Sequence, residues 1–251
     1  MKNMKILKIL KKILIYTLIL TLVSVVVLVL WNFGSIYFMQ DSDAFLLEKD
    51  SYSNLTTVNQ DVCTLHKSNF NDFYTVDVEQ VKCLARNSDK PFTIFFSFAS
   101  WCSGCSEDLP KAVKFANEIG SDFYILLIDR ECDNMFTYQT VQILQTKRIS
   151  AKTVILSDSL YSTEKLRKPQ KRSFFDLGIQ RRDKYSNFIK QITPPQFEKS
   201  IDEGMGKFFI FNNKGDIIYI NSHNDYYDEN GNIVEDYNYF LNKIRAAIKE
   251  K

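Results

Sequence analysis

Two apolar runs on either side of a helix-length segment constrain the fold of this chain most strongly. Residues 92–98 (FTIFFSF) and 123–128 are short, continuous and rich in aromatic and branched side chains, as buried strands are. The segment between them ends at Gly120, a residue common just past helix ends. Its apolar residues recur at helical spacing: Leu109, Val113, Ala116 and Ile119. A strand, a helix and a strand in succession predict a βαβ unit with two parallel strands.

The C-terminal third predicts a second group of elements. Residues 208–211 and 217–220 are apolar and flank a turn that contains Gly215, which predicts a β-hairpin. Residues 235–249 predict an amphipathic helix with an apolar side made of Tyr239, Phe240, Ile244 and Ile248. A further helix is expected over residues 78–86. The chain is therefore expected to be an α/β protein with a central mixed β-sheet flanked by helices.

The chemistry is expected at the joint between the strand 92–98 and the helix that follows it. This joint reads Trp101-Cys102-Ser103-Gly104-Cys105, and two cysteines three apart on a first helical turn can form a small disulfide ring. Free backbone N–H groups and the helix dipole favour a thiolate at Cys102, which we expect to be the nucleophile. Cys105, one turn further in, is expected to be the shielded resolving thiol. Trp101 would form a flat apolar wall beside the sulfur.

Three other interpretations of the cysteine pair compete with this one. A zinc site needs four ligands, and the chain has one C-x-x-C unit and only two histidines, His66 and His223. A purely structural disulfide would close too short a loop to stabilise the fold much. An inert buried pair does not suit an exposed junction between strand and helix.

The strand FTIFFSF, the sequence ASWCSGC and Pro110 five residues after Cys105 resemble the thioredoxin superfamily. Glu107 and Asp108, with an N-terminal apolar run, are most similar to the membrane-anchored, extracytoplasmic TlpA-like thiol-disulfide oxidoreductases. The resemblance covers residues 78–129 and resumes at residue 208, about half of the chain. It implies a thioredoxin-like fold and disulfide exchange on exported proteins, with Cys102 and Cys105 as the redox pair.

The chain departs from the family pattern at two positions. The family has a cis-proline just before the strand that corresponds to residues 208–211, and this chain has Met205-Gly206 there. Both residues are candidates for the substrate groove, and Gly206 leaves the backbone accessible. Thioredoxins also carry a buried acid where this chain has Phe96. Asp108 is the candidate for proton transfer to Cys105 in its place, and the alternative for Asp108 is a solvated acid that favours the helix dipole.

An N-terminal membrane anchor is expected over residues 13–38. Residues 13–31 contain no charge, glycine or proline, and at ~1.5 Å per residue they reach the ~30 Å of a hydrocarbon core. Five lysines precede this run and the first acid after it is Asp41, which orients the tail of residues 1–12 to the cytoplasm. A cleavable signal peptide is the competing interpretation, although no alanine that could form its cleavage site occurs before Ala44. The localisation expected is a single-pass membrane protein with its folded domain periplasmic or extracellular, in a bacterial cell envelope.

The charge distribution argues against nucleic acid as a partner. The chain has a formal net charge of +2, and beyond the five N-terminal lysines 27 basic and 30 acidic residues leave −3. This mildly acidic remainder offers no basic footprint for a phosphate backbone. No cofactor and no metal are expected. The expected partners are protein thiols and disulfides outside the cytoplasm, and a separate redox partner.

A spacer is expected over residues 39–75, followed by the thioredoxin-like domain over 76–251 with an insertion at about 131–205. The insertion contains a β-like run, residues 153–156, and a basic stretch. The basic residues are Lys165, Arg167, Lys168, Lys171, Arg172, Arg181, Arg182 and Lys184. Such a stretch is expected to be a solvated face, and contact with anionic lipid or an acidic partner is the alternative.

Three cysteines lie outside the motif: Cys63, Cys83 and Cys132. Outside the cytoplasm a bridge from Cys63 to Cys83 would tie the spacer to the first helix and leave Cys132 alone. Any of the three could be the odd one, and all three could be buried apolar side chains.

The function expected is that of a membrane-anchored thiol-disulfide oxidoreductase. Two alternatives remain. One is a thioredoxin-fold binding or assembly module that has lost turnover along with the cis-proline. The other is a copper or zinc chaperone that uses the cysteines with His223.

Overall fold

The computed structural model describes residues 15–26, 55–57, 63, 73–130, 134–163, 174–201, 204–228, 230–234 and 236–249. The chain divides into two compact units, residues 1–51 and residues 52–251. In the first unit, residues 15–26 are helical and carry exposed apolar side chains. Within the described ranges, no helix combines the length and the hydropathy that crossing a bilayer requires. The anchor expected over residues 13–38 extends beyond the described helix at both ends.

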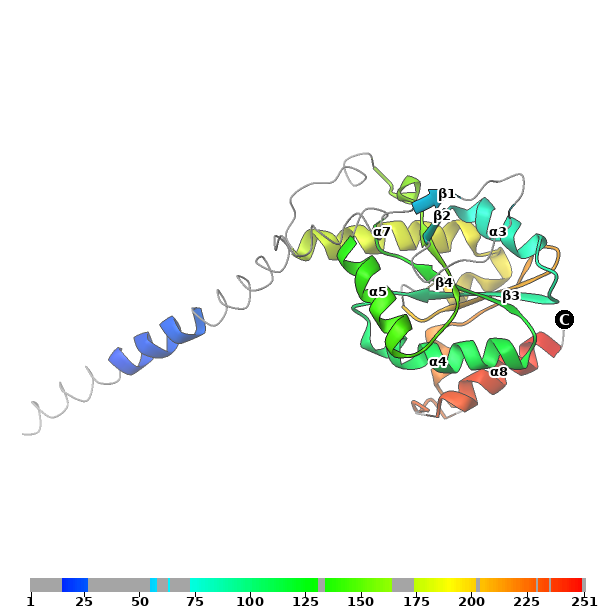
Figure 1. The fold of residues 1–251 in the computed structure, drawn as a ribbon. Helices are drawn as coiled ribbons and strands as arrows, with labels where there is room; N and C mark the ends of the chain where they lie inside the picture. The colour runs from blue at the N-terminus through cyan, green and yellow to red at the C-terminus, as the bar shows by residue number, and fades with distance from the viewer. Residues whose placement is uncertain are drawn as a thin grey trace, which may run out of the picture. The chain divides into compact units, whose positions relative to one another are not determined.

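The second unit is built on one mixed β-sheet (Figure 1). In the described part of the chain its order is β1-β2-β5-β4-β3-β6-β7. The first five strands in this order are parallel, β6 is antiparallel to β3, and β7 is antiparallel to β6. The strands are β1 (Leu55–Thr57), β2 (Phe73–Val76), β3 (Phe92–Phe98), β4 (Asp122–Leu127), β5 (Lys152–Leu156), β6 (Phe208–Asn212) and β7 (Ile217–Ile220). The mixed sheet predicted from the sequence is confirmed.

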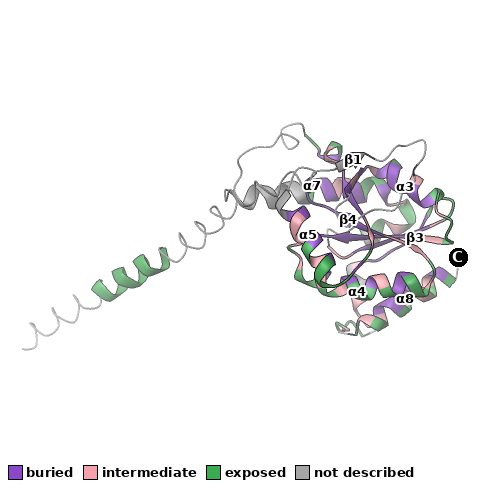
Figure 2. Cartoon of the chain, viewed as in Figure 1, coloured by how far each residue is buried: buried purple, intermediate pink, exposed green. Residues whose placement is uncertain are grey.

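Helices cover both faces of this sheet, and the strands between them are buried (Figure 2). Apolar residues of α4, α5 and α8 pack with one face, and those of α3 and α7 pack with the other. The α-helices are α3 (Val78–Arg86), α4 (Ser103–Glu118), α5 (Asn134–Thr146), α7 (Phe174–Ile192) and α8 (Tyr237–Lys249). Three 3-10 helices complete the described elements: η2 (Asp158–Leu160), η3 (Pro195–Ser200) and η4 (His223–Tyr226).

The local predictions for the βαβ unit and the hairpin are confirmed. β3 and β4 are parallel, with Phe98 opposite Leu127, and α4 connects them. Gly120 follows α4 with a φ of +66°, the left-handed conformation that glycine adopts without strain. β6 and β7 form the predicted antiparallel pair.

The C-terminal helix differs in detail from its prediction. α8 begins at Tyr237, and its buried residues are Phe240, Leu241, Ile244 and Ile248. Tyr239, which was expected on the apolar side, is only half-buried, and Lys243 Nζ lies 4.8 Å from the centre of its ring. Leu241 is buried in place of Tyr239, because the buried side of α8 is rotated toward Leu241 relative to the predicted apolar side.

The middle of the chain contributes a strand to the interior of the sheet. The predicted run at residues 153–156 is β5, which lies between β2 and β4 and is parallel to both. β1 and β2 lie in the range expected to be a spacer, so the sheet begins before residue 76. These two strands have only three and four residues, too few for a long apolar pattern, and they are recognised by their pairing in the sheet.

The predicted bridge from Cys63 to Cys83 is confirmed, with a Cα to Cα distance of 5.6 Å. It joins residue 63 to α3, the helix that follows β2. Cys132 and His66 lie outside the described residues.

Candidate functional site

The redox motif lies where β3 ends and α4 begins, and Cys102 is the residue that caps the helix. Its φ and ψ of −89° and 102° are extended, its N–H donates to the carbonyl of Ala99 (3.0 Å), and its carbonyl accepts from Ser106 (3.1 Å). Cys105 is then the third residue of the helix, and its backbone N–H donates to Sγ of Cys102 (3.2 Å). The sulfur of Cys102 therefore occupies the place where helix N-termini accept anionic or acceptor groups.

The two cysteines are bonded to each other and differ in exposure. Cys102 is half-buried and packs at the boundary of both core clusters, whereas Cys105 is 3% exposed inside one of them. An apolar setting disfavours a thiolate at Cys105, while the helix N-terminus favours one at Cys102. The attacking and resolving roles predicted for the pair suit this arrangement.

Gly206 lies against the buried sulfur, as alignment backwards from the strand predicted. A Cβ placed on Gly206 would be 3.9 Å from Sγ of Cys105 and 3.7 Å from the ring of Phe96. Because β6 is antiparallel to β3, with Phe96 opposite Phe208, the start of β6 reaches the edge of the sheet where β3 ends. The φ of Gly206 is +75°, so glycine suits this position for its backbone as well as for space. Met205, which precedes Gly206, is half-buried and packs against both core clusters.

A buried polar network holds the Gly206 segment in place. Gly206 N–H donates to the carbonyl of Ser97 (3.1 Å), and Lys207 N–H donates to the Ser97 hydroxyl (2.9 Å). The hydroxyl of Tyr185 on α7 also donates to Oγ of Ser97 (2.8 Å). The sequence predicted no role for Ser97, although a serine hydroxyl within the apolar run FTIFFSF indicates a buried group that needs partners.

Trp101 is exposed by 47%, and its indole donates a hydrogen bond. Its Nε1 donates to Oδ1 of Asp129 (3.1 Å), a 1% exposed residue just after β4. The loops after parallel strands meet at the carboxyl edge of the sheet, which is why the loop after β4 reaches the loop after β3. From the sequence, Asp129 was predicted only to end a strand, and its hydrogen bond to Trp101 was not predicted.

The solvated face expected for the basic stretch is wrong at Lys184. It belongs to the basic stretch expected to be a solvated face, yet it is 0% exposed. Its Nζ donates to the carbonyls of Asp129 and Leu156 and to Oδ1 of Asp158 (3.0 Å). A buried ammonium needs such partners, and the ends of β4 and β5 supply them. Arg182 is exposed, and the side chains of the other six basic residues lie outside the described set.

Asp108 lies in the second turn of α4 and pairs with Lys111 (2.9 Å). Among the described residues it forms no hydrogen bond to either cysteine. Its charge also raises the pKa of Tyr237, after the larger effect of that ring's burial. The proton-transfer role of Asp108 stays a prediction, and the position behind Cys105 is the fully buried, apolar Phe96.

The described residues contain no group of three or more His, Cys, Asp or Glu side chains arranged to hold a metal ion. The side chain of His223 lies outside this set.

No protein-family model matches the chain, and no curated protein matches it in sequence. An uncharacterized thioredoxin-like protein from Porphyromonas gingivalis is 15% identical over 63% of this chain and 76% of its own, with a TM-score of 0.33. A thiol-disulfide oxidoreductase candidate from Bacteroides vulgatus is 14% identical over 51% of this chain and 60% of its own, with a TM-score of 0.27.

Proposed function

We propose that the chain is a thiol-disulfide oxidoreductase that exchanges disulfides with other proteins. The observation that carries this proposal is the pair Cys102–Cys105, bonded at the start of α4 with one sulfur half-buried and the other enclosed. A stabilising disulfide would close a longer loop than three residues. A redox pair needs one accessible sulfur and a second sulfur within bonding distance.

The exchange proceeds in two balanced steps. In the reduced protein the Cys102 thiolate attacks one sulfur of a partner disulfide, so that a mixed disulfide forms and the partner's other sulfur leaves as a thiolate and takes a proton. Cys105 then loses its proton and attacks Sγ of Cys102, which reforms the bond in the structure and releases the partner's second thiol. Two electrons pass to the partner. The same steps in reverse oxidise a dithiol, and the direction follows from the potentials of the two couples.

A trapping experiment tests the roles of the two cysteines. In Cys105→Ser nothing expels the bound partner, so mixed disulfides should accumulate as bands that disappear on reducing gels. Cys102→Ser should form almost none, because the remaining thiol is 3% exposed. Equal bands in the two variants would overturn the assignment of Cys102 as the attacking thiol and Cys105 as the resolving thiol.

The proposal places the domain outside the cytoplasm on a retained N-terminal anchor. The uncharged run of residues 13–31, the five lysines before it and the bridge from Cys63 to Cys83 support this placement, since structural disulfides persist in oxidising compartments. Protease added outside the membrane should digest the chain beyond residue 40 and leave the lysine tail protected. Recovery of a soluble protein that begins near Ser35 would contradict the anchor.

A binding module without turnover is the second candidate, and Gly206 in place of a proline is the observation that favours it. An insulin reduction assay separates the two, because only an oxidoreductase precipitates the insulin chains.

A further inference from the structure

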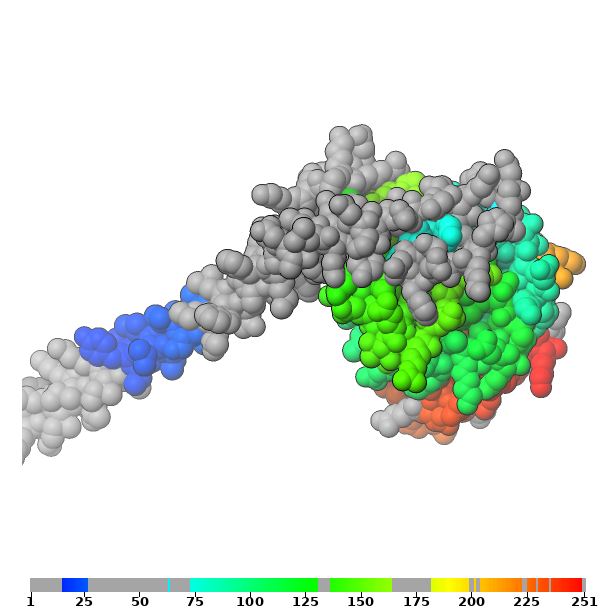
Figure 3. All heavy atoms as spheres, in the orientation of Figure 1, coloured from blue at the N-terminus to red at the C-terminus, as the bar shows by residue number. Residues whose placement is uncertain are grey.

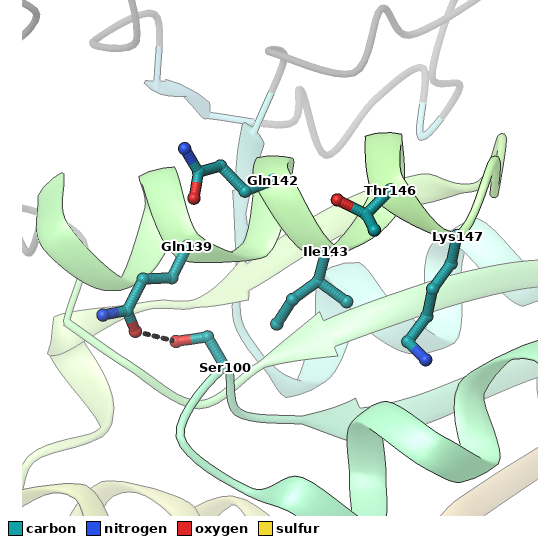
Figure 4. A pocket seen from close by; sticks show the side chains of 6 residues that line it. All are labelled: Ser100, Gln139, Gln142, Ile143, Thr146 and Lys147. Carbon is teal, nitrogen blue, oxygen red and sulfur yellow. Dashed lines mark hydrogen bonds between the residues drawn. The ribbon is translucent and has the colours of Figure 1, made fainter.

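Two open hollows border α5 or the residues just after it, and both include Lys147. The first has a volume of about 460 Å³ and is lined by Ser100, Gln139, Gln142, Ile143, Thr146 and Lys147 (Figure 4). The second, of about 660 Å³, is bounded by α4 between Pro110 and Glu118 and by residues 147–150. Because Lys147 lines both, we treat the two hollows together and call them the α4–α5 trough. Side chains of both helices are visible on the face shown in Figure 3.

The trough begins beside the redox pair. Ser100, which lines its first hollow, precedes Cys102 by two residues, a span of at most about 7 Å. The Ser100 hydroxyl donates to Oε1 of Gln139 (3.0 Å), a contact that joins the redox loop to α5 (Figure 4). A chain lying in the trough would therefore be next to the sulfur that we expect to react.

The trough carries uncompensated positive charge. Within the described part of the chain, no acidic side chain pairs with Lys114, Lys147 or Arg148. The acid that lines the second hollow, Glu118, is already paired with Arg245 on α8. The rest of the chain beyond its first five lysines is mildly acidic, so this local excess of positive charge is not a property of the whole domain.

Arg148 provides a second observation. It follows the last turn of α5 with a φ of +54°, and the N–H of Ile149 donates back to Leu144 (2.9 Å), which forms the helix ending that favours glycine. A side chain in this conformation costs about 1 kcal/mol. The chain keeps a cation at a position where its backbone favours glycine, and this cation lines the trough.

We propose that the α4–α5 trough binds an extended acidic segment of the protein partner whose disulfide reacts with Cys102. This inference rests on the proposed function and adds a chemical class to its substrate. The α4 wall runs from Pro110 to Glu118, a rise of about 12 Å, which matches about four residues of extended chain. Carboxylates of that segment would lie against Lys114, Lys147 and Arg148, while the amide of Gln139 and the hydroxyl of Ser100 lie at the end nearest the thiol.

Two matched peptides test the proposal with the full-length protein in an uncharged detergent. Each has one cysteine, as a mixed disulfide with 2-mercaptoethanol, between two blocks of four residues that are all Glu in one peptide and all Gln in the other. Reduced protein should react about tenfold faster with the Glu peptide at low salt, and the preference should fall as salt screens the charges.

The trough variant is Lys114→Gln, Lys147→Gln and Arg148→Gln together. It should lose the preference and keep the wild-type rate with the Gln peptide. Its control is Lys90→Gln, Lys214→Gln and Lys249→Gln, which removes the same charge from exposed positions outside the trough and should keep the preference. Lys147→Gln alone should lose most of the preference, because Lys147 lines both hollows.

A binding measurement keeps this inference separate from the redox function. A fluorescent Glu peptide with serine in place of cysteine should bind the oxidised protein. Its affinity for the oxidised trough variant should be at least about tenfold lower. If the protein binds this peptide but reduces neither disulfide peptide, the proposed trough function stands and the proposed oxidoreductase activity is overturned. If both peptides are reduced at equal rates, or if the trough variant keeps the preference for the Glu peptide, the proposed trough function is overturned and the proposed oxidoreductase activity stands.

Discussion

Lys184 donates a hydrogen bond from its buried ammonium to the backbone carbonyl of Asp129, whose carboxylate in turn holds the exposed indole of Trp101. A helix from the middle of the chain thus supports the loop beside the redox pair. The same ammonium reaches the end of β5 at Leu156, so it joins three segments that are far apart in sequence.

Replacing Lys184 should destabilise the domain strongly. Lys184→Met would leave two carbonyls and the Asp158 carboxylate without their buried donor, which we expect to cost about 2–4 kcal/mol in the free energy of unfolding. Urea unfolding measures this loss. Lys190→Met, at an exposed position of the same helix, is the control and should change stability by less than about 0.5 kcal/mol. Similar losses in both variants would show that the buried contacts of Lys184 contribute little.

Gly206 and Gly104 should respond in opposite ways to alanine. A Cβ on Gly206 meets no atom closer than 3.7 Å, but its φ of +75° is strained for alanine, so Gly206→Ala should cost about 1–2 kcal/mol. Gly104 is a helical residue in open space, and Gly104→Ala should stabilise by about 0.5–1 kcal/mol. Unfolding of both oxidised variants compares them. A stabilised Gly206→Ala would show that this segment does not need a left-handed backbone.

Asp129 should control the mobility of Trp101. In a Trp31→Phe background, Asp129→Ala removes the acceptor of the indole N–H, and acrylamide should quench Trp101 fluorescence more strongly. Asp129→Asn keeps a carbonyl acceptor at the same place and should quench as the parent does. If both variants quench alike and more than the parent, the charge of Asp129 rather than its hydrogen bond restrains the indole.

Stability should fall at high pH because three buried tyrosines resist ionisation. Burial raises the pKa of Tyr124, Tyr219 and Tyr237, and Asp225 adds to the effect at Tyr219 through its charge and a hydrogen bond (3.0 Å). Above the ordinary tyrosine pKa of about 10 the unfolded chain loses these protons and the folded chain keeps them, so stability is intact below pH 10 and decreases above it.

Well above pH 10, each such tyrosine adds about 1.4 kcal/mol per pH unit to the fall in the free energy of unfolding, and about half of that at pH 10 itself. Urea unfolding of the oxidised protein at pH 9, 10 and 11 measures this slope, which should be shallower in Tyr219→Phe. An unchanged slope in that variant would contradict the contribution of Tyr219.

Local sequence determined the redox joint. The apolar run of β3, the helical spacing after Trp101 and the two cysteines three residues apart are short-range patterns, and each acts within one strand or one helical turn. They predicted that Cys102 would be the more accessible and Cys105 the more enclosed of the two cysteines, and that β3 and β4 would be parallel. The resemblance to the thioredoxin superfamily, aligned backwards from β6, placed the family's cis-proline position at Gly206, and in the structure Gly206 lies against Cys105.

Tertiary structure alone decided what surrounds that joint. In the sequence Lys184 is an ordinary member of a basic stretch, and only the packing of α7 on the sheet removes it from water. Two of its partners are backbone carbonyls, which no residue type in the sequence identifies. β5 enters the interior of the sheet through pairing with β2 and β4, which lie about 80 and 30 residues before it. Burial and long-range pairing depend on how distant segments meet. For this reason the contacts that support the redox loop, and the α4–α5 trough, could be seen only in the folded chain.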